Sequence, residues 1–172
     1  MNILTFDIED WYNCDFISTD LNWDKYEVRI YEGVDRILEE LEFHKLKATF
    51  FCLGWIAEKH PDVIRKIHSQ GHHIGCHSYQ HELSFRFDRN GFRNDTEKSK
   101  KLIEDIIGER IDAFRAPGFS VTVQNLWAFE VLAELGFDYD CSIFPAKHDY
   151  GGLSNYGRSE PAILALADGK KL

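Results

Sequence analysis

The stretch His73-Ile74-Gly75-Cys76-His77-Ser78-Tyr79-Gln80-His81 joins a short apolar run to two histidines that are four positions apart. The apolar run at residues 73–76 is predicted to be a buried strand that delivers the histidines at its carboxyl end. Two imidazoles at positions i and i+4 reach one metal ion if the segment turns helically, because these positions share one face of a helix. The spacing alone is a weak signal, and a second cluster of candidate ligands strengthens it.

That second cluster follows the first apolar run of the chain. Residues Thr5-Phe6-Asp7-Ile8-Glu9-Asp10-Trp11 place three carboxylates directly after a predicted strand at residues 2–6. Carboxylates at the end of a buried strand need a partner or a metal ion, because an isolated buried charge is unfavourable. The cluster therefore supplies candidate acidic ligands for an ion held by the two histidines.

Short apolar runs alternate with amphipathic segments along the whole chain. We expect strands at residues 2–6, 47–53, 73–76, 112–114 and 137–141, with Gly54 ending the second strand. We expect helices at residues 32–45, 96–107 and 124–135, a further helix from Pro61 to Gly71, and a polar loop at residues 82–94. The alternation predicts parallel strands in an α/β barrel or a doubly wound sheet. No internal repeat or linker divides the chain, so residues 1–172 are expected to form one domain.

Polar clusters follow these strands at the carboxyl ends, where α/β folds place their active sites. In chain order they are Asp7, Glu9 and Asp10; His77 and His81; Arg115, Pro117 and Gly118; and Asp140, Ser142 and His148. Because the carboxyl ends of parallel strands share one edge of the sheet, we expect these clusters to form a single active site.

The composition excludes several classes of function. The chain has 172 residues, of which 44% are hydrophobic, so it has the apolar content of a folded core rather than of a disordered segment. A net charge of −9 argues against a partner nucleic acid and against an anionic membrane surface. We see neither a signal peptide nor a membrane span, and the four cysteines are interpreted as buried free thiols, so we expect a cytoplasmic protein.

The order of the motifs resembles the polysaccharide deacetylase family, the NodB-homology carbohydrate esterases. That family opens with a TFDDG-like motif, which residues 5–11 match in a variant form, and its second motif, His-Ser/Thr-x-x-His, is matched fully by residues 77–81. Its third motif, Arg-x-Pro, is matched by Phe114-Arg115-Ala116-Pro117-Gly118. The FDxEDW opening is similar to a subgroup of bacterial exopolysaccharide and envelope enzymes. The resemblance implies an irregular (β/α) barrel that hydrolyses the N-acetyl groups of a polysaccharide.

Two departures from the family pattern affect what is expected. Ile8 stands where the family has the second aspartate of its opening pair, so the acidic ligand is either Glu9 or Asp10. The late Leu-x-His motif is absent, and the chain ends where about five strands of the barrel would be complete. We therefore expect an incomplete barrel that lacks its last strands and exposes apolar surface near Phe137, Tyr139 and Ile143. Exposed strand edges favour pairing with another chain, so self-association into a homo-oligomer is expected.

The resemblance also implies roles for the clustered residues. His77, His81 and one acid would hold Zn²⁺ or another divalent transition metal, and Asp7 would be the general base. Arg115 would keep Asp7 ionised and oriented, and the backbone N–H of Gly118 would face the developing oxyanion. His148 is the only downstream histidine and is the candidate general acid.

Several alternatives stay open at this point. The chain could be an inactive domain that binds sugar or a partner, or a metal-independent amidase of the same superfamily that acts on a small cyclic amide. Asp140 is either a supporting acid near Arg115 or a solvated surface residue. Trp11, Tyr12 and Trp23 could stack on sugar rings, although packing in the core is the favoured role for each of them.

Overall fold

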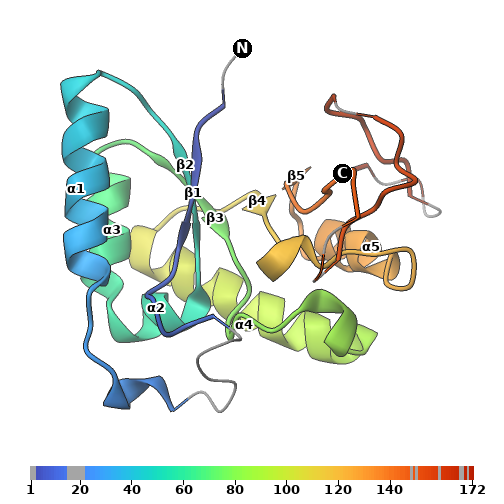
Figure 1. Ribbon diagram of the computed structural model, residues 1–172, viewed down its shortest axis with the longest axis horizontal. Helices are drawn as coiled ribbons and strands as arrows, with labels where there is room; N and C mark the ends of the chain where they lie inside the picture. The colour runs from blue at the N-terminus through green and yellow to red at the C-terminus, as the bar shows by residue number, and fades with distance from the viewer. Residues whose placement is uncertain are drawn as a thin grey trace.

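Five parallel strands form one sheet in the computed structural model, which describes residues 3–14, 22–147, 149, 151–158, 160–166, 169 and 171–172. The strands are neighbours in chain order: β1 (Thr5–Ile8), β2 (Thr49–Cys52), β3 (His73–Cys76), β4 (Ala113–Phe114) and β5 (Tyr139–Asp140) (Figure 1). Ile8 lies opposite Cys52, and Cys52 lies opposite Cys76, so the carboxyl ends of the first three strands are level. The predicted α/β class and the parallel sheet are confirmed, and the strand expected at residues 73–76 has the predicted bounds.

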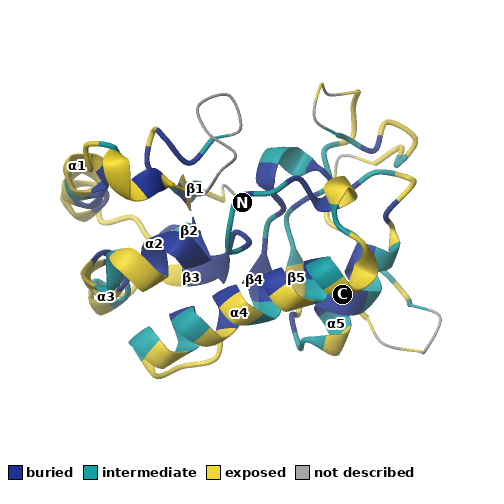
Figure 2. Ribbon diagram, turned by 90° about the horizontal axis from the view of Figure 1, so that it is seen from below, coloured by how far each residue is buried: buried dark blue, intermediate teal, exposed yellow. Residues whose placement is uncertain are grey.

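Amphipathic helices connect the strands and pack on the sheet with their apolar faces. The α-helices of the described residues are α1 (Ile30–Phe43), α2 (Gly54–Lys59), α3 (Pro61–Ser69), α4 (Arg89–Ile107) and α5 (Trp127–Glu134). Helix α3 buries Val63, Ile64 and Ile67, which recur at helical spacing. Figure 2 shows the same division in the longer helices, whose exposed residues face away from the strands. None of the helices in the described parts of the chain combines the length and apolar character that a membrane span needs.

Two parts of the predicted secondary structure are wrong. Gly54 does not simply end a strand but begins α2, a helix that buries Trp55, Ile56 and Ala57. A Cβ atom on Gly54 would lie 2.6 Å from Ser99 Oγ, so the glycine allows α2 to pack directly on α4. The segment at residues 82–94 is not a loop throughout, because it contains a 3₁₀ turn (Ser84–Arg86) and the first turns of α4.

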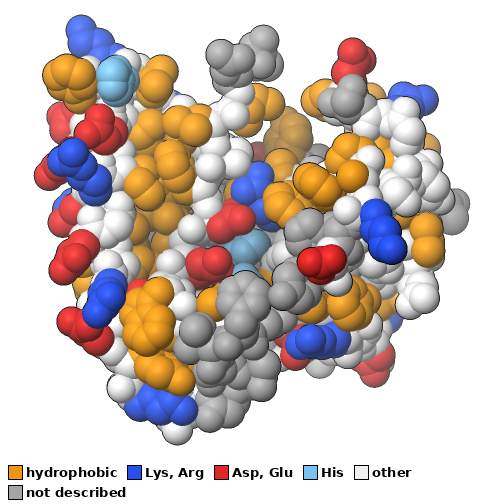
Figure 3. Space-filling model, viewed as in Figure 1, with side chains coloured by type: hydrophobic (Ala, Val, Ile, Leu, Met, Phe, Trp, Pro, Cys, Tyr) orange, Lys and Arg blue, Asp and Glu red, His pale blue; other side chains and the backbone are white. Residues whose placement is uncertain are grey.

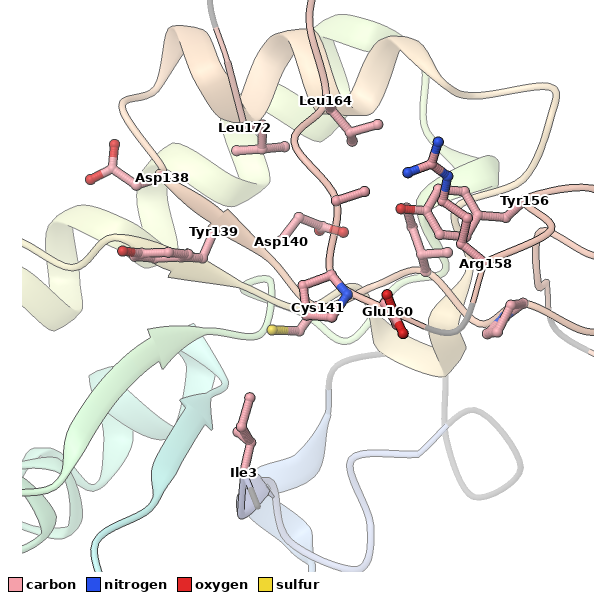
Figure 4. A pocket seen from close by; sticks show the side chains of 14 residues that line it. Ile3, Asp138, Tyr139, Asp140, Cys141, Tyr156, Arg158, Glu160, Leu164 and Leu172 are labelled. Atoms are coloured by element: carbon pink, nitrogen blue, oxygen red, sulfur yellow. The ribbon is translucent and has the colours of Figure 1, made fainter. Parts of the chain in front are cut away.

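The sheet is open, as the sequence predicted. Among the described residues, β1 pairs only with β2, and β5 pairs only with β4. A cavity of about 410 Å³ lies between Ile3, which precedes β1, and the chain around Tyr139 and Cys141 (Figure 4). The predicted exposure of apolar surface near Phe137, Tyr139 and Ile143 holds for Tyr139, which is 60% exposed, but not for Phe137, which is 2% exposed and lies in the core.

The described part of the C-terminal segment folds back over this region instead of adding a strand to the sheet. Leu164 and Leu172 exchange two backbone hydrogen bonds, of 2.8 and 3.1 Å, and both side chains pack against the hydrophobic core. Figure 4 shows both leucines on the side of the cavity opposite Ile3. The segment therefore covers apolar surface beside β5 without closing the sheet.

Candidate active site

The carboxyl ends of β1 and β3 bring Glu9, His77 and His81 together. One ligand atom from each side chain lies within 4.8 Å of the other two, and His81 Nε2 is 2.6 Å from Glu9 Oε2. The two histidines are buried, and the Glu9 side chain is 30% exposed. In Figure 3, acidic, basic and histidine side chains gather in a recess at the centre of the face shown. The structure thus assembles a three-residue cluster of a type that binds metal ions, open to solvent on one side.

The two histidines approach one another through a turn rather than through a helix. Ser78 and His81 have φ angles of 63° and 58°, in the left-handed region that non-glycine residues rarely adopt. The hydroxyl of Ser78 accepts a hydrogen bond from the backbone N–H of His81 at 3.0 Å. The helical turn that the HxxxH spacing suggested is therefore absent, and the two rings lie 5.3 Å apart at a steep angle. Strained backbone of this kind persists only when its surroundings hold it.

The N-terminus of α2 provides part of that support. Gly54 donates its backbone N–H to the carbonyl oxygen of Ser78 at 2.8 Å, and Trp55 donates to that of Tyr79 at 2.9 Å. These N–H groups belong to the first turn of α2, where they have no partner within the helix. The short helix that sequence analysis missed is therefore the element that holds one side of the histidine turn.

Asp95 in α4 holds the other side of the turn. Its carboxylate accepts hydrogen bonds from the backbone N–H groups of Tyr79, at 2.9 Å, and Gln80, at 3.3 Å. Burial raises the pKa of Asp95 to about 6, although the two hydrogen bonds act in the opposite direction. Sequence reasoning missed this residue because it began the helix at residue 96, so Asp95 fell between the expected loop at residues 82–94 and the helix, whereas α4 begins at Arg89. The available signal was the spacing, because Asp95 lies four positions before Ser99 on the buried face of α4.

Arg115 links the aspartate of the first cluster to a histidine of the second. Its Nη1 donates to Asp7 Oδ1 at 2.8 Å, and its Nη2 donates to Thr5 Oγ1 at 2.9 Å. The backbone carbonyl oxygen of Arg115 lies 2.8 Å from His77 Nδ1. A carbonyl oxygen only accepts hydrogen bonds, so Nδ1 of His77 carries the proton and Nε2 presents a lone pair. That Nε2 atom is 4.0 Å from Asp7 Oδ2.

The electrostatic environment favours the protonation states that metal ligands need. Burial lowers the pKa of His77, and the nearby charges of Asp7 and Glu9 only partly offset this effect. Burial alone would raise the pKa of Glu9, but the hydrogen bond with His81 and the charges of both histidines lower it overall. A neutral imidazole and an ionised carboxylate are the forms that coordinate a cation.

Asp10 is engaged elsewhere. Its Oδ2 accepts the backbone N–H groups of Arg29, at 2.8 Å, and Ile30, at 2.9 Å, at the start of α1. Its Oδ1 accepts the N–H of Trp11 at 2.8 Å. Of the two acids that the sequence left open, the structure brings Glu9 into the cluster with the histidines and uses Asp10 to tie the β1 loop to α1.

Gly118 and Phe119 complete the wall of the recess, which we call the active-site hollow. The hollow measures about 470 Å³ and is lined by Asp7, Glu9, Asp10, Trp11, Cys14, His77, His81, Gly118 and Phe119. Gly118 lies in a 3₁₀ turn (Pro117–Phe119) with a φ of 58°. The Arg-x-Pro segment therefore turns back toward the histidines, as the shared strand-end position predicted.

Asp140 at the end of β5 supports the segment that carries Arg115. Its carboxylate accepts hydrogen bonds from the N–H and the hydroxyl of Ser142, at 2.9 and 2.6 Å. The Ser142 hydroxyl in turn accepts the backbone N–H of Ala116 at 2.8 Å. Burial raises the pKa of Asp140 to about 6, against the opposing effects of these hydrogen bonds and of the Arg115 charge. His148, the candidate acid, lies outside the described residues.

Comparisons with known proteins bear on the family to which the chain belongs. A family model described as polysaccharide deacetylase matches residues 3–139. A peptidoglycan-N-acetylglucosamine deacetylase of Bacillus cereus is 34% identical over 100 residues, which cover 58% of this chain and 36% of that protein. A peptidoglycan deacetylase of Helicobacter pylori is 30% identical over 112 residues, which cover 64% of this chain and 37% of that protein.

Solved structures share the fold. A protein from Mycobacterium smegmatis assigned to the polysaccharide deacetylases superimposes with a TM-score of 0.71 at 29% identity, over 83% of this chain and 50% of that one. A peptidoglycan N-acetylglucosamine deacetylase in complex with an N-hydroxybenzamide compound gives a TM-score of 0.60 at 27% identity, over 80% of this chain and 54% of that one. The chain thus spans about a third of the length of these curated relatives and about half of these solved chains. With the family model matching most of its length, the chain belongs to the polysaccharide deacetylase family.

Proposed function

We propose that this protein hydrolyses the N-acetyl groups of an N-acetylated polysaccharide with the help of a bound divalent metal ion. The observation that carries the proposal is the position of Asp7, which is paired with Arg115 and lies 4.0 Å from a histidine of the Glu9–His77–His81 cluster. Candidate metal ligands and a candidate base thus face the same hollow. The relatives named above as peptidoglycan deacetylases support an amide of N-acetylglucosamine as the substrate.

The three clustered residues fit a catalytic zinc site. Two imidazoles and one carboxylate form a common ligand set of hydrolytic zinc enzymes, which leave a further position open. His77 has the outer hydrogen bond that ligating histidines usually make, from Nδ1 to the carbonyl oxygen of Arg115. A bound Zn²⁺ would lower the pKa of a water molecule and polarise the acetamide carbonyl group.

The protein's own residues then have distinct roles in the reaction. Asp7 accepts the proton of the attacking water, and the Arg115 guanidinium holds the Asp7 carboxylate in one orientation. The backbone N–H of Gly118 donates to the carbonyl oxygen as negative charge develops on it. The C–N bond breaks, the sugar amine leaves with a proton, and acetate is released. His148 remains our proposed donor of that proton.

A second candidate is a domain that binds the polysaccharide without hydrolysing it. The observation that favours it is the open sheet, in which β1 and β5 each lack one neighbour among the described residues. The two candidates make different predictions for the same assay, because a binding domain holds the sugar but releases no acetate.

The decisive experiment measures acetate release from N-acetylglucosamine oligomers by the Zn²⁺-loaded protein. We expect turnover in the parent protein, about one zinc ion per chain, and loss of both on replacement of His77 and His81 by alanine. Equal zinc content in the double variant and the parent would contradict the proposed site. Stoichiometric zinc without acetate release would favour the binding domain.

A further inference from the structure

Trp11 lies at the rim of the active-site hollow, two residues after Glu9. It is 44% exposed and contributes to the same lining as Glu9 and His77. Two other aromatic residues of this region, Tyr12 and Trp23, are 0% and 1% exposed and belong to the core. The sequence favoured a core role for all three residues. This role holds for Tyr12 and Trp23 but not for Trp11, which is exposed at the rim of the hollow.

The orientation of the Trp11 ring is determined by several contacts. Its Nε1 donates to the carbonyl oxygen of Glu27 at 3.0 Å, and its backbone N–H donates to Asp10 Oδ1. The ring makes edge contacts with Tyr12 and Tyr26. The ring centroids are 5.6 and 5.3 Å away, and the ring planes are inclined by 79° and 72°. A ring held in this way loses little conformational entropy when a ligand stacks on it.

Trp11 lies outside the hydrophobic core, with 44% of its surface exposed. Tyr12 and Tyr26 already stack on one another, with ring centroids 5.4 Å apart and planes at 16°. The Arg29 guanidinium is 5.8 Å from the Trp11 ring, a distance at which a cation interacts weakly with an exposed indole. The combination of exposure, fixed orientation and a place in the hollow is what a binding surface needs.

We propose that Trp11 is a stacking platform for a pyranose ring of the glycan substrate. The C–H groups on one face of a pyranose are apolar and match the flat face of an indole, while the sugar hydroxyls stay in water. The hollow, at about 470 Å³, has room for more than the acetamide group that reacts. This inference rests on the proposed function, because it takes its ligand from that function, and it adds a residue that positions the sugar.

The test measures binding of the N-acetylglucosamine tetramer by calorimetry, in the Asp7→Asn background so that the sugar is not consumed. Trp11→Leu keeps apolar bulk but removes the ring, and we expect about tenfold weaker binding. Trp11→Phe keeps a smaller ring and should recover part of the affinity. Phe43→Ala removes an aromatic side chain that is 80% exposed outside the hollow, and it should bind like the parent.

Kinetics in the otherwise unaltered protein separate positioning from a general loss of structure. Trp11→Leu should raise KM for the tetramer while kcat and zinc content stay close to the parent values. If Trp11→Leu binds the tetramer as tightly as the parent does, Trp11 is not a stacking platform, whatever the acetate assay shows. Binding that depends on Trp11 without acetate release supports the platform and contradicts the proposed hydrolysis. A parent protein that does not bind the tetramer contradicts both.

Discussion

Asp7 and Arg115 are 108 positions apart in the sequence, yet Arg115 Nη1 lies 2.8 Å from Asp7 Oδ1. The same arginine holds His77 through its backbone carbonyl oxygen, at 2.8 Å. Side chain and backbone of one residue therefore support the candidate base and a candidate metal ligand separately. This separation allows the two functions to be altered independently.

Arg115→Ala tests that separation. The substitution removes the guanidinium from Asp7 but keeps the carbonyl oxygen that His77 needs, so zinc should remain at about one ion per chain. We expect kcat to fall by about 10²-fold, because a misplaced base transfers protons less effectively. Acetate release and elemental analysis on the same preparation give both values. Loss of zinc together with activity would show that the side chain is needed to build the metal site.

Asp7→Asn distinguishes a base from a ligand. An amide of the same shape cannot accept the proton of water, so we expect hydrolysis to fall by about 10²- to 10⁴-fold while zinc stays bound. Glu9→Gln is the matched control, because it alters an acid that we place in the metal cluster and should lower zinc affinity. If Asp7→Asn emptied the site instead, Asp7 would have to be counted among the ligands.

Asp95→Ala tests the support of the histidine turn. The backbone N–H groups of Tyr79 and Gln80 would lose their acceptor, and we expect the free energy of unfolding to fall by about 1–3 kcal/mol. Zinc affinity should fall by about 10- to 100-fold, as for other groups that orient metal ligands. Asp105→Ala alters an exposed acid of the same helix and should change neither value. If the two variants had the same free energy of unfolding and the same zinc affinity, Asp95 would not support the turn.

The stability of the metal-free protein should depend on pH through Asp140. Burial raises the pKa of this acid from 3.8 to about 6, so the folded state binds its proton more tightly than the unfolded state does. The contribution to stability is complete below about pH 4 and is lost as the pH rises through about 6. Urea unfolding in the presence of a chelator gives the free energy of unfolding at each pH between 4 and 7. This free energy should fall less with rising pH in Asp140→Asn than in the parent. If the free energy of unfolding fell equally with pH in both proteins, Asp140 would not be the cause of the pH dependence.

The open edges of the sheet should promote self-association. Ile3 is 71% exposed and Tyr139 is 60% exposed, and these residues lie at the two open sides of the sheet. We expect light scattering to detect oligomers whose mass rises with protein concentration, and Tyr139→Lys to shift them toward the monomer. A monomer at all concentrations in the parent would show that the edges are sufficiently covered by the C-terminal segment.

Local patterns were enough to predict the general architecture and most of the candidate residues. The period of the apolar residues is imposed by strand and helix geometry, so it identified the strand at residues 73–76 and the sequence of parallel strands. Parallel strands then place their carboxyl ends along one edge, which is why Asp7, His77 and Arg115 could be assigned to one site. The family model, which matches residues 3–139, agrees with the family that the motifs predicted.

Only the tertiary structure distinguishes the positions of Glu9 and Asp10, because it brings Glu9 alone into the cluster with His77 and His81. The two acids are adjacent in the sequence, and what separates them is the start of α1, whose N–H groups bind Asp10 from about 20 positions away. The histidine turn is a similar case, because Asp95 and the first turn of α2 hold Ser78 and Tyr79 in a shape that the HxxxH spacing does not encode. Sequence by itself determined which residues reach the active-site edge, since that depends on local periodicity. Their orientation there depends on hydrogen bonds between segments that only folding brings together.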